Sequence, residues 1–259
     1  LKHGEAKVFI VPKRFRNFDH EQLANRLKTK IETLQHVVVV NGLEENNFDR
    51  VLVNHGLEQD SSAVTNLDQL EARPDDITQL IFTSGTTGEP KGVMHTANTL
   101  FSNIVPYAER LHLNQNDVVL MASPMAHQTG FMYGLMMPIE LNAKVVLQDV
   151  WDVSQAVDLI HQHQVSFTMA STPFLNDLST TVAEQQNQVS SLKTFLCAGA
   201  PIPGSLVQKA RETLSVKVIS AWGMTECGAI TTTRPEDEDE RSFNTDGIAL
   251  PGVEIKIVN

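Results

Sequence analysis

The sequence predicts an α/β fold in which mostly parallel sheets are flanked by helices. Short runs of β-branched residues recur along the chain, segments of helical period separate them, and glycine-rich loops directly follow several of the runs. Apolar runs of four to six residues are typical of strands that a parallel sheet buries on both faces. Alternation of strands with helices favours right-handed crossovers and helices on both faces of the sheet. In such folds, ligands bind beyond the carboxyl ends of the strands.

Eight runs are expected to form strands. They are residues 7–11, 37–40, 80–83, 118–122, 144–147, 165–169, 195–197 and 216–220. Three expected helices carry apolar stripes at three- and four-residue spacing. These stripes are Leu23, Leu27, Ile31 and Leu34; Val153, Ala156, Val157 and Ile160; and Leu206, Val207, Ala210 and Leu214.

Residues at the predicted ends define these elements further. Asp19 and Asp152 each stand three residues before a glutamine, which predicts a capping box at the start of the first two helices. Another helix is expected from Thr96. Residues 41–73 are predicted as loop and short helix, and the acidic run 235–240 as a solvated loop.

The composition indicates an ordinary globular protein of one large domain or two smaller ones. The chain has 259 residues, of which 41% are apolar and 20% charged. Its formal net charge of −11 argues against nucleic acid or an anionic membrane as a partner, since both bind concentrated basic faces. Apolar stretches such as residues 131–139 are too short to span a bilayer, so no transmembrane anchor is expected. Cys197 and Cys227 show no metal-ligand spacing, which favours free thiols and a cytoplasmic location.

The most informative segment is the decapeptide at residues 83–92, Thr-Ser-Gly-Thr-Thr-Gly-Glu-Pro-Lys-Gly. Its glycines let backbone N–H groups converge on phosphate oxygens, its hydroxyls add donors, and its lysine adds a mobile positive charge. It follows an apolar strand and precedes a helix, an arrangement in which phosphate sites are built. A Walker loop is excluded, because Pro90 stands where that loop needs glycine and Gly92 where it needs serine or threonine. The expected phosphate-binding residues are Thr83, Ser84, Gly85, Thr86, Thr87, Gly88 and Lys91.

Two further loops follow predicted strands. Residues 221–226, Ala-Trp-Gly-Met-Thr-Glu, place an aromatic ring beside a glycine, which lets the ring stack on a planar base. The Thr225 hydroxyl and the Glu226 carboxylate suit a phosphate oxygen and its Mg²⁺, which prefers one or two carboxylates plus substrate phosphates. The third loop carries a lone histidine, His127. Taken singly, each has a plain alternative: Trp222 as core filling, Glu226 as a surface cap and His127 as a satisfied loop histidine.

Together these loops resemble the AMP-forming, acyl-activating (adenylate-forming) superfamily, which includes acyl-CoA synthetases, peptide-synthetase adenylation domains and luciferases. Residues 83–92 match the superfamily's Thr-Ser-Gly-Thr-Thr-Gly-x-Pro-Lys-Gly motif in full. Residues 222–226 match its aromatic-Gly-x-Thr-Glu motif, with tryptophan where tyrosine is usual. Residues 199–201, Gly-Ala-Pro, resemble the turn that borders adenine, and residues 124–127 resemble its Pro-x-x-His segment. The sequence around Cys197 looks closest to fatty- or cyclic-acid CoA ligases.

The resemblance implies a ligase that makes an acyl-CoA in two steps. A carboxylic acid attacks the α-phosphate of ATP to give an acyl-adenylate and pyrophosphate, and coenzyme A then displaces AMP. By analogy, His127, Thr225 and Glu226 would act at the reacting groups, and Glu226 and Thr86 would hold Mg²⁺. The nucleotide-binding residues implied beyond the phosphate loop are Gly199, Ala200, Pro201, Trp222, Gly223 and Met224. The residues implied to line an apolar acyl pocket are Met125, Met132, Met136, Met224 and Ala198, with core packing an equal alternative for Met132 and Met136.

The resemblance also implies a domain organisation. Residues 1–259 are expected to be the central part of the AMP-binding large domain, with 1–72 as a lead-in and 73–259 as the nucleotide- and acyl-binding core. The superfamily's Thr-Gly-Asp segment, its hinge and its small C-terminal domain are expected to lie outside this sequence. The chain alone is then expected to turn over poorly, since losing one positioned charge can cost roughly a hundred- to a thousandfold in rate. A homodimer is one option for its assembly.

Two alternatives stay open at this point. An amino-acid-activating adenylation domain shares the chemistry, but usually carries an acidic residue in its pocket. The only acid in the stretches expected to line the pocket here is Glu212, on a predicted surface helix. The second alternative is a non-catalytic nucleotide-binding scaffold derived from a ligase, against which the complete phosphate loop, Thr225 and Glu226 argue. The favoured substrate is therefore an apolar carboxylic acid of undetermined chain length.

Overall fold

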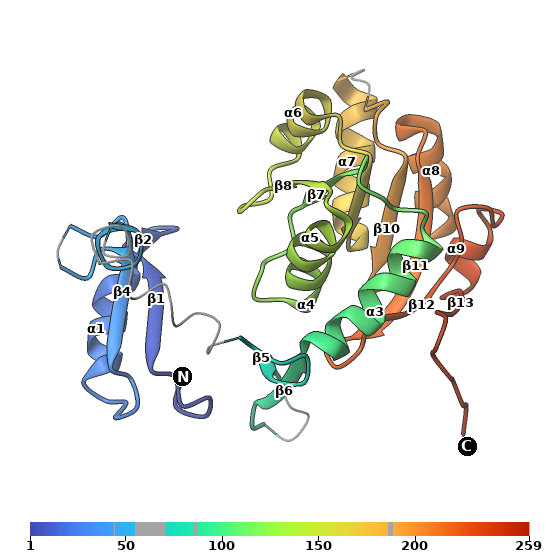
Figure 1. Cartoon of the computed structure of the whole chain (residues 1–259). Coiled ribbons are helices and arrows are strands. Elements are labelled where there is room, and N and C mark those ends of the chain that lie inside the picture. Colours follow the sequence, from blue (N-terminus) through green and yellow to red (C-terminus); the bar gives the residue numbers. More distant parts are fainter. Residues whose placement is uncertain (44, 55–70, 85–87, 186–188, 259) are drawn as a thin grey trace. The chain divides into compact units, whose positions relative to one another are not determined.

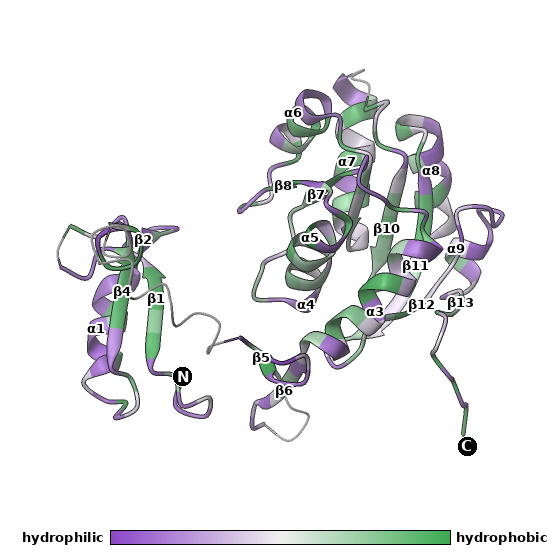
Figure 2. Ribbon diagram, viewed as in Figure 1, coloured by the Kyte–Doolittle hydropathy of each residue, from purple (hydrophilic) through white to green (hydrophobic). Residues whose placement is uncertain are grey.

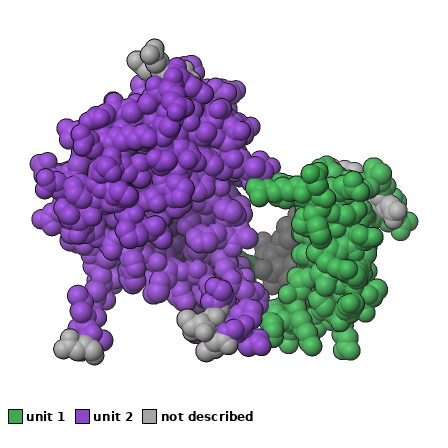
Figure 3. Space-filling model, turned by 180° about the vertical axis from the view of Figure 1, so that it is seen from behind, with its two compact units in different colours: residues 1–73 green, residues 74–259 purple. Residues whose placement is uncertain are grey.

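The computed structural model describes residues 1–43, 45–54, 71–84, 88–185 and 189–258. The chain divides into two compact units, residues 1–73 and residues 74–259 (Figure 3). Each unit has a hydrophobic core of its own. Among the residues that the structure describes, no helix combines the length and the apolar character that crossing a membrane requires.

The first unit is a small α/β layer. Strand β1 (Val8–Pro12) pairs in parallel with β4 (His36–Val40), and helix α1 (His20–Lys28) lies between them in sequence (Figure 1). The strands β2 (Arg14–Phe15) and β3 (Phe18–Asp19) form a short hairpin before α1, and a π-helical segment, η1 (Asp49–Asn54), follows β4. Buried residues of β1, α1 and β4 form the core of this unit together with Leu34.

The predicted first helix is confirmed at its start and wrong at its end. The Asp19 carboxylate accepts a hydrogen bond from the Gln22 backbone N–H at 2.8 Å, so Asp19 caps α1. The helix ends at Lys28, and Ile31 and Leu34 lie beyond it in the turns that lead to β4. Leu34 is buried all the same. Apolar spacing therefore continues into the core after the helix has ended, and it does not locate the last turn.

The second unit is built on a seven-stranded sheet with the order β13-β12-β11-β10-β9-β7-β8. Five neighbouring strands are parallel, whereas β12 and β13 run antiparallel at one edge. The strands are β7 (Val118–Met121), β8 (Lys144–Leu147), β9 (Phe167–Ala170), β10 (Thr194–Ala198), β11 (Lys217–Met224), β12 (Gly228–Thr232) and β13 (Ile248–Ala249). The predicted mostly parallel α/β sheet is confirmed, and each of its parallel strands lies on a predicted run. The two antiparallel strands are not among the runs that the sequence predicts.

Helices cover both faces of this sheet. Successive side chains of a strand point to opposite faces, and in β10 Phe195 and Cys197 belong to one hydrophobic cluster whereas Leu196 belongs to another. The first cluster includes residues of α6 (Val153–His163), α7 (Thr172–Gln185) and α8 (Gly204–Leu214). The second includes residues of α3 (Ala97–Arg110), α4 (Gln128–Phe131), η3 (Met132–Met136) and α5 (Met137–Leu141). Figure 2 shows the corresponding pattern, with apolar residues along the strands and mixed, two-sided helices around them.

Three of the predicted helices are confirmed in this unit as α3, α6 and α8. Thr96 and Asp152 each accept a hydrogen bond from the backbone N–H three residues on, so both are N-caps. The sequence predicts the cap at Asp152, whereas at Thr96 it predicts only the start of a helix, and there the Thr96 N–H also donates to the Thr99 hydroxyl to complete a capping box. The sequence does not predict α7, since its buried face includes Ser179 among the leucines and valine. A last short helix, α9 (Arg241–Asn244), precedes β13.

The phosphate loop lies within a hairpin, so the predicted strand–loop–helix arrangement is wrong. Strand β5 (Ile77–Thr83) pairs antiparallel with β6 (Lys91–Thr96) as a separate two-stranded sheet, and α3 begins only after β6. Thr83 stands opposite Lys91, where the loop leaves and rejoins the ladder. In β6 only Val93 and His95 are buried, the alternation of a strand that is covered on one face. One of these two positions is a histidine, which hides the strand pattern in the sequence.

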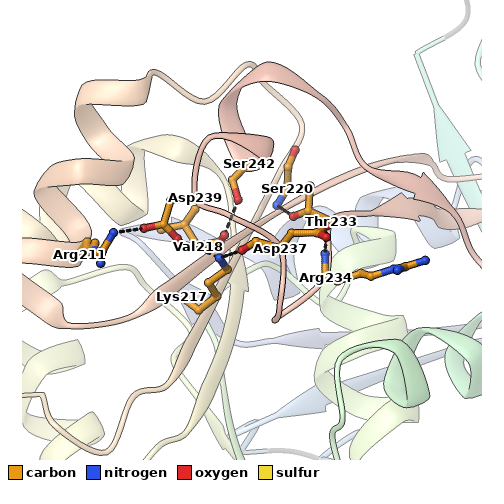
Figure 4. A network of polar contacts seen from close by, with 9 residues as sticks. All are labelled: Arg211, Lys217, Val218, Ser220, Thr233, Arg234, Asp237, Asp239 and Ser242. Carbon is orange, nitrogen blue, oxygen red and sulfur yellow. Dashed lines mark hydrogen bonds and ion pairs between the residues drawn. The ribbon is translucent and has the colours of Figure 1, made fainter.

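The acidic run 235–240 is tied to the sheet, which corrects the prediction of a simply solvated loop. Lys217, the first residue of β11, donates hydrogen bonds to the Asp237 carbonyl and to the Asp239 carboxylate (Figure 4). Arg211 of α8 donates to the same carboxylate at 2.9 Å. The pKa of Asp239 is held below its usual range, chiefly by the hydrogen bond from Lys217, while partial burial opposes this shift.

Candidate active site

A pocket of about 580 Å³ lies at the carboxyl ends of the parallel strands in the second unit. Ser123 after β7, Ser171 after β9 and Gly199 after β10 line it, with the end of β11. From β7 the chain passes to β8 on one side of β7. From β8 it then crosses to β9 on the other side of β7, so the strand order reverses beside β7. The crevice at such a reversal is the usual ligand site of an open α/β sheet.

The pocket brings together seven residues that the sequence predicts as catalytic or nucleotide-binding residues. They come from three predicted loops and from the turn after β10, and they are Thr83, His127, Gly199, Gly223, Met224, Thr225 and Glu226. Segments more than a hundred positions apart in the sequence therefore line the same pocket. This meeting allows one ligand to contact hydroxyl, imidazole and carboxylate groups at once.

The turn from β11 to β12 carries the pocket's carboxylate. β11 extends to Met224, so residues 222–224 form the end of a strand rather than the loop that the sequence predicts. A β-carbon at Gly223 would lie 1.9 Å from the Gly228 carbonyl oxygen, so only glycine allows the two strands to approach this closely. Thr225 and Glu226 follow in the turn, where Thr225 is half-buried and Glu226 is exposed.

Trp222 does not fill the core, so that alternative is wrong. Its side chain is 45% exposed, and neither Trp222 nor the exposed residues Ala200 and Pro201 are among those that line the pocket. Gly199 does line the pocket, at a φ of +87° that favours glycine. The predicted adenine contacts therefore divide, with Gly199, Gly223 and Met224 at the pocket and the other three residues outside its lining.

His127 is exposed at the pocket and is also bound locally. Its Nδ1 accepts a hydrogen bond from the Thr129 backbone N–H at 3.2 Å at the start of α4. The backbone N–H of His127 donates to the Pro124 carbonyl. Because Nδ1 accepts, the neutral ring carries its hydrogen on Nε2. His127 thus has the local partner of the plain alternative and also lines the pocket, and its role at the reacting groups stays a prediction.

The structure describes only the ends of the phosphate loop. Thr83 is half-buried and lines the pocket, whereas Ser84, Gly88 and Lys91 are exposed and outside its lining. Gly88 has a φ of +91°, a conformation that a glycine adopts without strain. The predicted residues Gly85, Thr86 and Thr87 lie outside the described residues.

The methionines predicted for an acyl pocket separate into three groups. Met132 is fully buried in the second hydrophobic cluster and Met136 packs against that cluster, so the core alternative is the right one for both. Met125 is exposed and does not line the pocket. Met224 and Ala198 line the pocket, and their contact with an acyl group stays a prediction.

Several lining residues escape prediction from the sequence. They lie on elements without a motif, chiefly α4, η3 and the segment from β9 to α7, and include Gln128, Tyr133, Met169, Ala170 and Phe174. The exposure of a small or apolar residue to a pocket depends on the packing of its whole element. No local pattern distinguishes such residues from those of the core.

A closed set of three buried hydrogen bonds fixes one wall of the pocket. The Tyr133 hydroxyl donates to Asn103 Oδ1 at 2.7 Å and accepts from the Ala229 N–H at 2.8 Å, while Asn103 Nδ2 donates to the Ala229 carbonyl at 2.7 Å. Burial raises the pKa of Tyr133 well above its usual value, so the hydroxyl keeps its hydrogen. Residues from α3, η3 and β12 are thereby joined beside Gly228, which also lines the pocket.

Both cysteines of the chain are free thiols, as the sequence predicts. Cys197 is buried in β10, and burial raises its pKa to about 12. Cys227 is half-buried next to Glu226, and burial raises its pKa as well. Neither thiol is therefore activated for nucleophilic chemistry.

Comparison with known proteins decides the family. A family model described as AMP-binding enzyme matches residues 1–259. The chain belongs to this family. Among curated relatives, the medium-chain fatty-acid–CoA ligase of Escherichia coli is 31% identical over all 259 residues, which span 45% of that protein. The 2-succinylbenzoate–CoA ligase of Bacillus pumilus is 34% identical over 69% of this chain and 36% of its own length.

Solved structures agree on the fold of this AMP-binding chain. A long-chain-fatty-acid–CoA ligase from Archaeoglobus fulgidus superposes with a TM-score of 0.74 at 26% identity, over 95% of this chain and 48% of that one. The anthranilate CoA ligase AuaEII, in complex with anthranoyl-AMP, gives a TM-score of 0.83 at 22% identity over 100% of this chain and 48% of that one. The chain thus spans about half the length of the relatives it matches.

The donor groups at the pocket fit Mg²⁺ only in company with a substrate. Within the described residues, no three His, Cys, Asp or Glu side chains gather as a metal site. Glu226 is the one acid among the lining residues that the structure describes, and Thr83 and Thr225 add hydroxyl oxygens. Mg²⁺ is commonly held by one or two carboxylates plus phosphate oxygens, and this set fits that mode.

Proposed function

We propose that the protein containing this AMP-binding chain activates a carboxylic acid with ATP to an acyl-adenylate and then transfers the acyl group to coenzyme A. The observation that carries the proposal is the meeting of Thr83, His127, Thr225 and Glu226 in one pocket at the strand-order reversal. Membership of the AMP-binding family and the naming of the relatives as CoA ligases support it. Residues 73–259 are proposed as the nucleotide- and acyl-binding core.

The proposed adenylation step joins two anions, so its main demand is charge. The carboxylate oxygen of the acid bonds to the α-phosphorus of ATP, and the bond from that phosphorus to the pyrophosphate oxygen breaks. Mg²⁺, when bound, neutralises phosphate charge, and Glu226 would hold it together with Thr86. The Thr225 hydroxyl would donate to an α-phosphate oxygen, and the phosphate loop with Lys91 would hold the β- and γ-phosphates. In the second step the coenzyme A thiol loses its proton, its sulfur bonds to the acyl carbon, and the bond from that carbon to the phosphate oxygen breaks to release AMP.

The acid is proposed to be apolar, with its carboxylate near His127. Ala170, Phe174, Ala198 and Met224 give the pocket an apolar wall. Glu226 is the single acid among the described lining residues and is assigned to Mg²⁺, which leaves no carboxylate to pair with an amino group and disfavours an amino-acid substrate. The relatives act on acids as different as medium-chain fatty acids and 2-succinylbenzoate by their names, so the chain length and the presence of a ring stay open. The cytoplasmic location and the homodimer stay predictions.

The test uses the protein expressed from its complete gene. Acid-dependent exchange of pyrophosphate into ATP, and then thioester formation with coenzyme A, would be measured over fatty, aromatic and amino acids. Glu226→Gln is expected to lower the exchange rate by about a hundred- to a thousandfold, since it removes one positioned charge. Glu212→Gln is the matched control, because Glu212 is exposed on α8, accepts a hydrogen bond from Gln208 one turn earlier in the same helix, and does not line the pocket as the structure describes it.

The outcomes separate the remaining alternatives. Exchange with amino acids alone would indicate an amino-acid-activating domain. Binding of an acyl-sulfamoyl-adenosine without exchange would indicate a nucleotide-binding scaffold. Absence of both in a folded protein would contradict the proposal.

A further inference from the structure

His95 is a buried histidine that the proposed chemistry does not use. It lies on β6, four residues after Lys91, and only 1% of its surface is exposed. Its Nε2 lies 2.8 Å from the Thr225 carbonyl oxygen, and its Nδ1 lies 3.1 Å from the Thr99 hydroxyl. The first contact spans 130 positions of sequence and ends on the turn that carries Glu226.

The direction of the Nε2 contact follows from its partner. A carbonyl oxygen only accepts hydrogen bonds, so Nε2 carries a hydrogen and donates to Thr225. Nδ1 either accepts the Thr99 hydroxyl hydrogen in the neutral ring or donates to that oxygen in the protonated ring. Nε2 donates in both forms, so the link to Thr225 persists through either.

The accepted carbonyl belongs to the peptide unit between Thr225 and Glu226. A peptide unit is planar, so holding its oxygen sets the dihedral angles on both sides of the plane. These angles determine where the Thr225 hydroxyl and the Glu226 carboxylate leave the backbone. Both side chains line the pocket.

The same strand connects this turn to the phosphate loop. Lys91, Val93 and His95 are every second residue of β6, so they share one face of the strand. Lys91 stands opposite Thr83 in the hairpin ladder. Four residues of strand span about 13 Å, so β6 carries the lysine of the loop at one end and the anchor of the turn at the other.

We infer that His95 is a positioning residue for adenylation. Its Nε2 hydrogen bond fixes the position of the Thr225–Glu226 peptide relative to the β5–β6 hairpin that carries the phosphate loop. The inference rests on the proposed function for its effect on rate. The placement of the turn itself does not, which allows the two to be tested separately.

The test compares His95→Leu with His95→Gln in the protein expressed from its complete gene. Leucine keeps the bulk and removes the donor, whereas glutamine keeps an N–H donor at a similar reach. We expect His95→Leu to lower kcat for acid-dependent pyrophosphate exchange by about tenfold to a hundredfold, because small misplacements of reacting groups have effects of this size. KM for ATP and for the acid should change by less than about threefold, and His95→Gln should restore kcat to within about fivefold of the parent.

Hydrogen exchange of the backbone amides at residues 225–228 gives a readout that needs no turnover. These amides should exchange faster in His95→Leu than in the parent and at the parental rate in His95→Gln. If the parent shows no pyrophosphate exchange, the proposed function fails, and the amide exchange still decides whether His95 holds the turn. Unchanged kcat in His95→Leu, equal losses in both variants, or unchanged exchange at the turn would each overturn the inference.

Discussion

Asp239 shows how one side chain can tie a loop to the end of a strand. Its carboxylate accepts hydrogen bonds from Lys217 of β11 and Arg211 of α8, both at 2.9 Å. Because folding lowers its pKa, the stabilisation from Asp239 is fully present above about pH 4, the value in an unfolded chain, and is lost as the pH falls through the lower folded value. Asp239 therefore stabilises the folded protein at neutral pH, and this stabilisation is lost in acid.

We predict that Asp239→Asn lowers the free energy of unfolding at pH 7 by about 1 kcal/mol or less, since partly exposed ion pairs contribute little. The difference from the parent should shrink as the pH falls below about 4. Urea denaturation of both proteins across this range measures it. Glu238→Gln, which removes an exposed carboxylate of the same loop, is the control. A difference that grows in acid would contradict the assignment.

At the scale of elements, the hydrogen bonds among Asn103, Tyr133 and Ala229 join two helical segments to the antiparallel strand β12. All three groups are buried, so each loses its contact with water on folding and must be paired within the protein. Tyr107 packs against Tyr133 with ring centroids 4.3 Å apart, but its hydroxyl reaches only the Met169 sulfur, a weak acceptor. The two tyrosines have similar burial and different partners.

This difference gives a matched pair of variants. Tyr133→Phe leaves Asn103 Oδ1 and the Ala229 N–H without their partner and should lower the free energy of unfolding by about 1–3 kcal/mol. Tyr107→Phe should lower it by less than about 1 kcal/mol, since losing the Tyr107 hydroxyl leaves only the Met169 sulfur, a weak acceptor, without its hydrogen bond. Urea denaturation measures both. Equal effects would mean that packing, and not the hydrogen-bonded set, determines the stability of this wall.

The elements also show what the sequence could and could not predict. Strands β7, β9 and β10 and residues 218–221 of β11 are apolar runs buried on both faces, and the edge strand β8 is also an apolar run, so local composition locates all five. The run 80–83 also locates the end of β5, but β6 is covered on one face and β12 is antiparallel, so neither of these two strands follows the same pattern. The helix starts at Asp19 and Asp152 were predictable because capping is a contact over three residues.

At the scale of the whole molecule, the pocket residues divide by the range of the contacts that place them. Thr83, His127, Thr225 and Glu226 follow strands or strand-like runs and belong to motifs, so the sequence identifies them. Met132 could not be assigned, because a buried position and a pocket position share the same apolar spacing. His95 was missed because its partner is 130 positions away and no local pattern connects the two. Motifs thus identify the groups that meet a ligand, whereas the groups that hold them in place depend on the tertiary fold.

The division of the chain into two units leads to a last prediction about ligand binding. Every residue that lines the pocket belongs to residues 74–259, among those that the structure describes. We therefore expect a medium-chain acyl-sulfamoyl-adenosine to slow backbone hydrogen exchange at the ends of β7, β10 and β11, and to leave residues 1–43 unchanged. At about a hundred times its Kd, such a ligand stabilises the state that binds it by about 2.7 kcal/mol, which is ample for detection by mass spectrometry. Protection of the same size in α1 and β4 would show that the first unit shares in the binding equilibrium, and the assignment of the site to the second unit alone would then be wrong.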